Sequence, residues 1–103
     1  MKTTIRLKFL ALHYNPTMPR KSTWVVYILR CKGGTLYTGI TNNLQRRLQT
    51  HNAGRASRYT RAHRPVKLVY QERAASRSAA LRREYEIKQW PRDKKAVLIG
   101  KIR

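Results

Sequence analysis

Two short runs of hydrophobic, β-branched and aromatic residues stand in the first half of the chain, separated by two glycines. The runs are Trp24 to Cys31 and Thr35 to Ile40, and their composition predicts two β-strands. Gly33 and Gly34 can adopt the positive φ angles of a tight reversal. The stretch therefore predicts a β-hairpin.

The length of the hairpin loop decides which side chains share a face of the sheet. Side chains alternate along a strand, so a three-residue loop over 32–34 places Tyr27 opposite Gly39 and brings Tyr37 to the same face as Tyr27. A two-residue loop would shift the register by one and place the tyrosines on opposite faces. We predict the three-residue loop, with a bulge.

A helical spacing of apolar residues follows the hairpin. Leu44, Leu48 and His51 stand at positions i, i+4 and i+7, which is the period of one helix face. Arg47 lies beside them, one turn before His51. The preceding segment 41–43, Thr-Asn-Asn, offers side-chain oxygens that can cap the helix. One arginine and one histidine therefore lie at the edge of the apolar stripe.

The second half of the chain mixes basic and apolar segments. Gly54 is placed to end the first helix, and Pro65 cannot stand inside a continuing helix. Ser76 can cap a further helix, and Gly100 can end the last one. This half is predicted to hold a basic loop over 55–65, a third strand over 66–73, a helix from Ser76 and a short last helix over 93–99.

The first 22 residues differ from the rest. A basic start and a short apolar stretch over 5–12 resemble a signal peptide, but charges interrupt the apolar part and no clear cleavage site follows. Prolines and polar residues over 15–23 are typical of a linker. We expect residues 1–22 to be disordered or an upstream extension, with translation beginning at Met1 or Met18, and one folded domain over 23–100.

Charge indicates the kind of partner. The chain has 24 lysines and arginines against 4 acidic residues, which gives a net charge of +20 over 103 residues. Such an excess predicts binding to a polyanion, most simply nucleic acid. An acidic membrane surface is the weaker alternative.

Cysteine content and hydropathy indicate the compartment and the classes of protein that can be excluded. Cys31 is the single cysteine, so an intrachain disulfide is excluded and a cysteine-based zinc site is not expected. This fits a reducing, cytoplasmic compartment. No apolar run approaches the roughly 20 residues of a membrane span, so we expect no membrane-embedded segment.

Basic residues recur every three positions through the predicted loop. The functional interpretation is contact with nucleic-acid phosphates, and the alternative is a solvated surface loop; the one-sided charge favours contact. Tyr59 either stacks on a base or anchors the loop. The candidate nucleic-acid-binding residues are Arg55, Arg58, Tyr59, Arg61, Arg64 and Lys67.

A carboxylate falls on the apolar face of the helix that starts at Ser76. Glu84 shares this face with Ala80, Leu81, Ile87 and Lys88, whereas Glu86 points almost opposite. Burying an unpaired charge is costly, so Glu84 either pairs with an arginine or binds a metal. Mg²⁺ commonly takes only one or two protein carboxylates and completes its octahedron with water and substrate phosphate.

The polar positions of the hairpin and the first helix resemble the core of the GIY-YIG nucleases. That family is named for two strand motifs, each with a tyrosine, and the triplets here read Val25-Val-Tyr27 and Tyr37-Thr-Gly39. Only the tyrosines and Gly39 match the name literally. The spacing is more specific, because Tyr37 follows Tyr27 by ten residues, Arg47 follows by ten more and His51 by four more.

The resemblance covers about residues 24–90 and is strongest to the small stand-alone, YhbQ-like branch of the family. It implies an α+β fold, a small three-stranded antiparallel sheet flanked by helices. It also implies a metal-dependent endonuclease that hydrolyses DNA, with Mg²⁺ or Mn²⁺ as cofactor. The implied catalytic residues are Tyr27, Tyr37, Arg47 and His51, and the implied metal ligand is Glu84.

Each residue type suits the role that the resemblance implies. Arg47 can give two parallel hydrogen bonds to phosphate oxygens. A free tyrosine, with a pKa of about 10, is a poor base, and a nearby cation favours its phenolate form. In the family, the counterpart of Tyr37 activates or positions water, that of Tyr27 orients the site, and that of His51 accepts or relays a proton.

Three functions fit the sequence. The first is the endonuclease, with a preference for DNA structure rather than sequence, a role in DNA repair or recombination, and association with the nucleoid. RNA remains open as a substrate. The second is a basic nucleic-acid-binding module without chemistry, which does not explain why Arg47, His51 and Glu84 all point inward. The third is a nuclease fold that needs a partner for activity.

Overall fold

The computed structural model describes residues 22–100, so the expectations for the N-terminal extension and for the translation start lie outside the described residues. The elements are β1 (Val25–Arg30), β2 (Leu36–Thr41), α2 (Leu44–Asn52), α3 (Arg58–Ala62), β3 (Lys67–Arg73), α4 (Arg77–Lys88) and α5 (Arg92–Gly100). None of these helices is long and apolar enough to cross a membrane.

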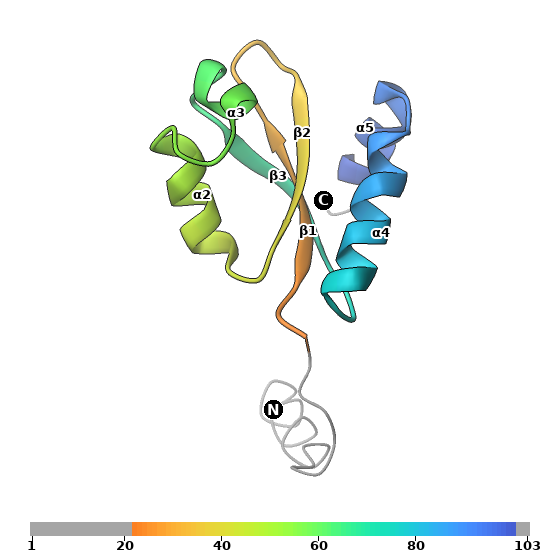
Figure 1. Ribbon diagram of the computed structural model, residues 1–103. Helices are drawn as coiled ribbons and strands as arrows, with labels where there is room; N and C mark the ends of the chain where they lie inside the picture. The colour runs from red at the N-terminus through yellow and green to blue at the C-terminus, as the bar shows by residue number, and fades with distance from the viewer. Residues whose placement is uncertain (1–21, 101–103) are drawn as a thin grey trace, which may run out of the picture.

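The fold is a three-stranded antiparallel sheet between two layers of helices. The strand order is β2-β1-β3, and both pairs are antiparallel. Helices α2 and α3 cover one face of the sheet, and α4 and α5 cover the other (Figure 1). The predicted α+β class and the three-stranded sheet are confirmed.

The hairpin has the predicted register. Tyr27 pairs with Gly39, and Leu29 pairs with Tyr37. The Cys31 amide donates to the Thr35 carbonyl over 2.8 Å, which closes a loop over 32–34. The Gly34 amide donates to the Cys31 carbonyl over 2.9 Å, and Gly34 has a φ angle of 92°, so Gly34 and Thr35 both oppose Cys31 and form the expected bulge. A separate register shift lies between β1 and β3, at Ile28 and Leu29.

The central strand supplies both hydrophobic cores, because its side chains alternate between the two faces. Val26 and Ile28 face the layer of α4 and α5, where they pack with Tyr70, Ala80, Ile87 and Ile99. Tyr27 and Leu29 face the layer of α2 and α3, where they pack with Cys31, Val66, Tyr37, Leu44, Leu48 and Leu68. A strand buried on both faces explains the continuous apolar run.

The basic segment after Gly54 was predicted to be a loop, but it contains the short helix α3. The Ser57 hydroxyl accepts the Thr60 amide over 3.1 Å and caps the helix. The Thr60 side chain is fully buried. The five-residue helix therefore depends on a tertiary contact rather than on helix propensity, which is why its sequence reads as a loop.

Helix α4 buries a narrower stripe than predicted. Ser76 caps it as expected, and Ala80 and Ile87 have no exposed surface. Leu81, however, is 39% exposed, and Lys88 is exposed as well. Leu81 lies 100° around the helix from Ala80, which is enough to turn it away from the sheet.

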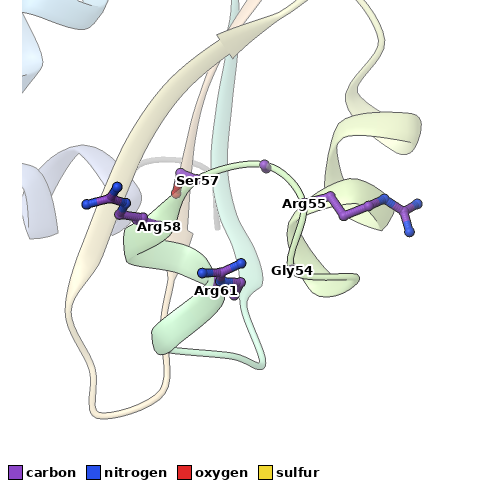
Figure 2. A pocket seen from close by; sticks show the side chains of 6 residues that line it. Gly54, Arg55, Ser57, Arg58 and Arg61 are labelled. Carbon is purple, nitrogen blue, oxygen red and sulfur yellow. The ribbon is translucent and has the colours of Figure 1, made fainter.

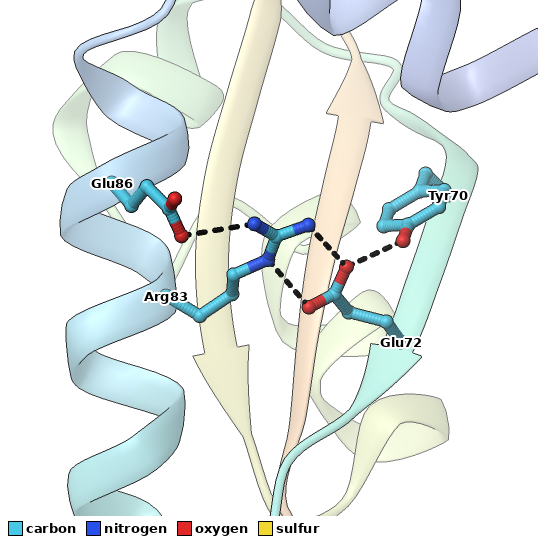
Figure 3. Close-up of polar contacts among 4 residues, drawn as sticks. All are labelled: Tyr70, Glu72, Arg83 and Glu86. Atoms are coloured by element: carbon cyan, nitrogen blue, oxygen red, sulfur yellow. Dashed lines mark hydrogen bonds and ion pairs between the residues drawn. The ribbon is translucent and has the colours of Figure 1, made fainter.

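An ion-pair network fixes α4 against β3 (Figure 3). The Arg83 guanidinium donates to Glu72 from Nε over 2.7 Å and from Nη2 over 3.2 Å, and to Glu86 from Nη1 over 2.9 Å. The Tyr70 hydroxyl also donates to Glu72. Burial raises the pKa of Glu72, but the bonds from Arg83 and Tyr70 outweigh burial and hold this pKa below its usual value. The network sets the rotation of α4 about its axis.

Candidate active site

Tyr27 reaches the site by crossing the neighbouring strand where that strand has no side chain. A Cβ atom built on Gly39 would lie 2.6 Å from the Tyr27 hydroxyl oxygen and 2.7 Å from Cζ. Real Cβ atoms essentially never approach so closely. Gly39 therefore lets the ring of Tyr27 lie across β2, which gives the glycine of the second triplet a physical reason.

His51 is completely buried between the two tyrosines. Its Nε2 atom lies 2.8 Å from the Tyr27 hydroxyl, and its Nδ1 atom lies 2.8 Å from the Thr60 hydroxyl. Tyr37 and the same imidazole pack in a T-shaped arrangement, with ring centroids 5.2 Å apart. Burial, helped by the charge of Arg47, lowers the pKa of His51 to about 4. The imidazole is therefore neutral at pH 7.

Arg47 stands one turn before His51 on α2, as predicted. Its Nε atom donates to the Tyr27 hydroxyl over 3.4 Å. Both terminal nitrogens of Arg47 are without a hydrogen-bond partner among residues 22–100. Together with its neighbours it lines a polar hollow of about 220 Å³, formed by Thr41, Asn42, Asn43, Arg46, Arg47 and Thr50. The guanidinium is thus available to an anion that enters this hollow.

The environment of Tyr27 favours the protonated phenol. Burial is the largest influence and raises its pKa; Arg47 lowers this pKa through its hydrogen bond and charge, and Tyr37 and Glu84 raise it. The net direction is upward. Arg47 favours the phenolate of Tyr27, as was expected of a nearby cation, but burial outweighs this effect and the pKa stays above its ordinary value. The hydroxyl remains a hydrogen-bond donor at neutral pH.

Glu84 comes from α4, in the layer opposite α2. Its side chain is 19% exposed, and its Oε2 atom lies 3.2 Å from Lys88 Nζ. The ion-pair partner is thus a lysine of the same helix rather than one of the arginines. The charge of Glu84 raises the pKa of Tyr27, so the carboxylate acts electrostatically on the tyrosine.

The donor set determines what kind of metal site could form. Residues 22–100 hold no group of three or more histidine, cysteine, aspartate or glutamate side chains that could enclose an ion. A site based on Glu84 would therefore be a single-carboxylate site. Mg²⁺ fits such a donor set, because it accepts one carboxylate when water and phosphate supply the other ligands.

Three of the predicted nucleic-acid-binding arginines surround one open hollow between α2 and α3 (Figure 2). Arg55, Arg58 and Arg61 line it together with Gly54, Ala56 and Ser57, and its volume is about 380 Å³. All three arginines are exposed, and their side chains spread in different directions. A flexible polyanion could contact more than one of them.

The remaining candidates differ in their surroundings. Arg64 donates to the carbonyls of Arg61, over 3.0 Å, and Asn52, over 3.4 Å. Tyr59 stacks on His63 with ring centroids 4.1 Å apart and donates to the Thr35 hydroxyl over 2.6 Å, so it anchors α3 to the hairpin loop. Lys67 is exposed at the start of β3.

Thr60 is the residue of this site that the sequence analysis missed. It lies in the segment that was expected to be a loop, and its contact with His51 spans nine residues and two helices. The spacing Ser57-x-x-Thr60 is a capping signal in hindsight, but no local pattern indicates that the Thr60 hydroxyl meets a histidine.

Comparison with known proteins identifies the family of the chain. Residues 23–96 match the family model described as the GIY-YIG catalytic domain. A UPF0213 protein of Staphylococcus haemolyticus is 54% identical over 74 residues, covering 72% of this chain and 90% of that one. A UPF0213 protein of Bacillus pumilus is 49% identical over 77 residues, covering 75% and 79%.

Among solved structures, the solution NMR structure of a UPF0213 protein from Bacillus halodurans is 42% identical, covers 75% of this chain and 82% of that chain, and superposes with a TM-score of 0.49. The match to the family model spans most of the chain, and the relatives align over most of their own length. The chain belongs to the GIY-YIG family of nuclease domains and, within it, to the UPF0213 group.

Proposed function

We propose that this protein is an endonuclease that hydrolyses the phosphodiester bonds of DNA. The observation that carries the proposal is the hydrogen bond between Tyr27 and a buried, neutral His51, next to an arginine whose terminal nitrogens have no partner among residues 22–100. Membership of a nuclease family supports the reaction class.

Arg47 binds the scissile phosphate in this proposal. Its two terminal nitrogens point to no partner in the described part of the chain, and it lines the polar hollow at the start of α2. A guanidinium can bond two nonbridging oxygens at once and stabilise the charge that develops on them.

The proton of the attacking water passes through Tyr27 to His51. The water oxygen forms a bond to phosphorus while the bond to the leaving oxygen breaks. The water proton goes to the Tyr27 oxygen as the tyrosine proton goes to Nε2 of His51. Bound phosphate favours the imidazolium that forms, because a nearby negative charge raises the pKa of a histidine.

Tyr37 has a different role from Tyr27 in this scheme. It contacts His51 through T-shaped ring packing, whereas Tyr27 contacts His51 through a 2.8 Å hydrogen bond. This difference favours Tyr27 as the residue that transfers the proton and leaves Tyr37 to position the water. The family resemblance alone left open whether the counterpart of Tyr37 activates or positions the water, and it gave the counterpart of Tyr27 the role of orienting the site.

Glu84 would hold the divalent cation, Mg²⁺ or Mn²⁺. When bound, such a cation neutralises the leaving oxygen and clamps the phosphate. Glu84 suits this role because most of its side chain is buried and it is one of only 4 acidic residues in the chain. Arg83 positions it indirectly, by fixing α4 against β3.

The substrate is proposed to be DNA recognised by its structure, in repair or recombination close to the nucleoid. A net charge of +20 supports binding to the backbone, which carries no sequence information. The arginines of the hollow beside α3 would hold the strand on one side of the site. RNA is the alternative substrate for the same chemistry.

The test is cleavage of plasmid and branched DNA with Mg²⁺, Mn²⁺ or EDTA, with binding measured in parallel. Arg47→Ala is compared with Arg82→Ala, which removes an exposed arginine of α4 outside this hollow, and Glu84→Gln with Glu86→Gln on the same helix. We expect metal-dependent cleavage that is lost in Arg47→Ala and Glu84→Gln and kept in both controls, while binding largely survives. Cleavage that persists in both variants would refute the assignment of the site.

A second function, binding of nucleic acid without cleavage or with cleavage only in the presence of a partner, is favoured by one observation. The Glu84 carboxylate already has the Lys88 ammonium as a partner at 3.2 Å. Tight binding without cutting of any substrate, with any metal, would support this second function instead.

A further inference from the structure

We propose that Thr60 is a positioning residue that holds the proton of His51 on Nδ1, so that Nε2 is free to accept the proton of Tyr27. The placement of that proton is a property of the free protein. Only its effect on cleavage depends on the proposed nuclease function.

One assignment of the protons gives those of Tyr27, His51 and Thr60 an acceptor each. A guanidinium has donors and no acceptor, so Tyr27 accepts from Arg47 Nε and retains its own proton for a different partner. That partner is His51 Nε2, at 2.8 Å. A neutral imidazole has one donor and one acceptor nitrogen. If Nε2 accepts, Nδ1 carries the proton and must donate.

Thr60 is the acceptor for that proton. Its hydroxyl oxygen lies 2.8 Å from His51 Nδ1, and the same hydroxyl donates to the Ser57 carbonyl over 3.4 Å or to the Ser57 hydroxyl over 2.8 Å. A hydroxyl that donates to Ser57 has its lone pairs available to Nδ1–H. The chain of bonds then runs from Arg47 through Tyr27, His51 and Thr60 to Ser57.

Burial favours this arrangement. His51 and Thr60 have no exposed surface, so water cannot take the place of either partner, and an unpaired polar group there is costly. The position of the Thr60 hydroxyl is also fixed, because α3 is tied to the hairpin by the bond from the Lys32 amide to the His63 carbonyl, 2.9 Å, and by the Tyr59–Thr35 bond.

Removing the hydroxyl should move the proton. In Thr60→Val the side chain keeps its shape, but Nδ1–H would be left without an acceptor. The other tautomer then becomes favourable, since its Nε2–H can donate to the Tyr27 oxygen. Tyr27 would lose the acceptor for its own proton. Thr60→Ser retains the hydroxyl and serves as the matched control.

The experiment is long-range ¹H–¹⁵N correlation NMR of ¹⁵N-histidine-labelled full-length protein at neutral pH, without nucleic acid. The His51 signals are assigned by their loss in His51→Gln. We expect a protonated Nδ1 and an unprotonated Nε2 in the wild type and in Thr60→Ser, and the reverse in Thr60→Val. A wild type protonated on Nε2 overturns the proposal even if Thr60→Val does not fold. A folded Thr60→Val that keeps its proton on Nδ1 overturns it as well.

Cleavage supplies a second readout. We expect kcat to fall about tenfold or more in Thr60→Val, in line with the loss of a general base, with KM little changed and recovery in Thr60→Ser. The predicted tautomers in a protein that cuts nothing would refute the proposed function alone. Cleavage by a wild type protonated on Nε2 would refute the role of Thr60 and the proton transfer to Nε2, and would leave the nuclease function standing.

Discussion

Substitution of Gly39 by alanine tests the close approach on which the site is built. The added methyl group would lie 2.6 Å from the Tyr27 hydroxyl oxygen and 2.7 Å from Cζ, where ordinary contact begins at 3.4 Å. The end of the ring must therefore move by about 0.8 Å. Tyr27 has almost no exposed surface, so the ring must move within packed surroundings.

Two effects follow from a displacement of this size. Overpacking of a core by one methyl group costs about 1–3 kcal/mol of unfolding free energy. The bond from Tyr27 to His51, now 2.8 Å, would lengthen beyond hydrogen-bonding range if the ring moved away from the histidine. Misplacement of a catalytic group by about 1 Å can lower the rate about 100-fold.

Urea denaturation measures the first effect and single-turnover cleavage the second. Gly100→Ala is the control, because a Cβ there meets nothing within 4 Å. A double-mutant cycle with Tyr27→Phe separates the clash between the added methyl group and the Tyr27 hydroxyl from other effects of the substitution. Because removal of the hydroxyl relieves the shortest contact, the two substitutions should show a coupling of about 0.5–3 kcal/mol in unfolding free energy. Additive effects, or a Gly39→Ala protein as stable and active as Gly100→Ala, would refute the reasoning.

Three further predictions concern pH and charge. Burial lowers the pKa of His51 to about 4, so between pH 6.5 and 4 only the unfolded chain protonates this imidazole, and the unfolding free energy should fall by about 3 kcal/mol as the pH drops through this window. Urea denaturation of wild type and His51→Gln at several pH values measures this fall. An equal dependence of the unfolding free energy on pH in the two proteins would contradict the prediction. The pKa of Glu72 lies below its usual value, so the ionised carboxylate stabilises the folded protein above about pH 4, and this stabilisation is lost as the pH falls below that value. Arg83→Met should remove the stabilisation and lower the unfolding free energy at pH 7 by about 1–3 kcal/mol, whereas Arg82→Met, at an exposed position, should not. Replacement of both Arg58 and Arg61 by glutamine should lower the slope of log Kd for DNA against log salt concentration by about 2. The control replaces Arg73 and Arg82 by glutamine, and an equal change of slope there would show that the arginines beside α3 do not contact DNA more than other surface arginines do.

Local patterns predicted the parts of the fold that depend on local chemistry. Two glycines fixed the length of the hairpin loop, and Gly33 and Gly34 do have φ angles of 90° and 92°. Asn43 caps α2 as its position suggested. The spacing of Leu44, Leu48 and His51 described the buried side of α2 correctly.

Long-range contacts account for what the sequence did not indicate. The contact between Thr60 and His51 stabilises helix α3, and the sequence of this five-residue helix alone does not predict such a contact. The resemblance to a family identified Tyr27 and Tyr37 as a pair, but only the three-dimensional arrangement distinguishes the hydrogen-bonded tyrosine from the one that packs in a T-shaped arrangement. Glu84 was expected to pair with an arginine or to bind a metal, and its lysine partner reflects the i, i+4 geometry of α4.

The central position of β1 gives the two parts of the site different resistance to local unfolding. Tyr27 belongs to the strand that is hydrogen-bonded on both sides, so its amide should exchange with deuterium only when the whole molecule unfolds. Arg47, His51 and Thr60 all belong to the outer layer of α2 and α3, which rests on half-buried leucines. A local opening of that layer would carry all three away together and leave Tyr27 in place, so the site would assemble and come apart as one cooperative unit.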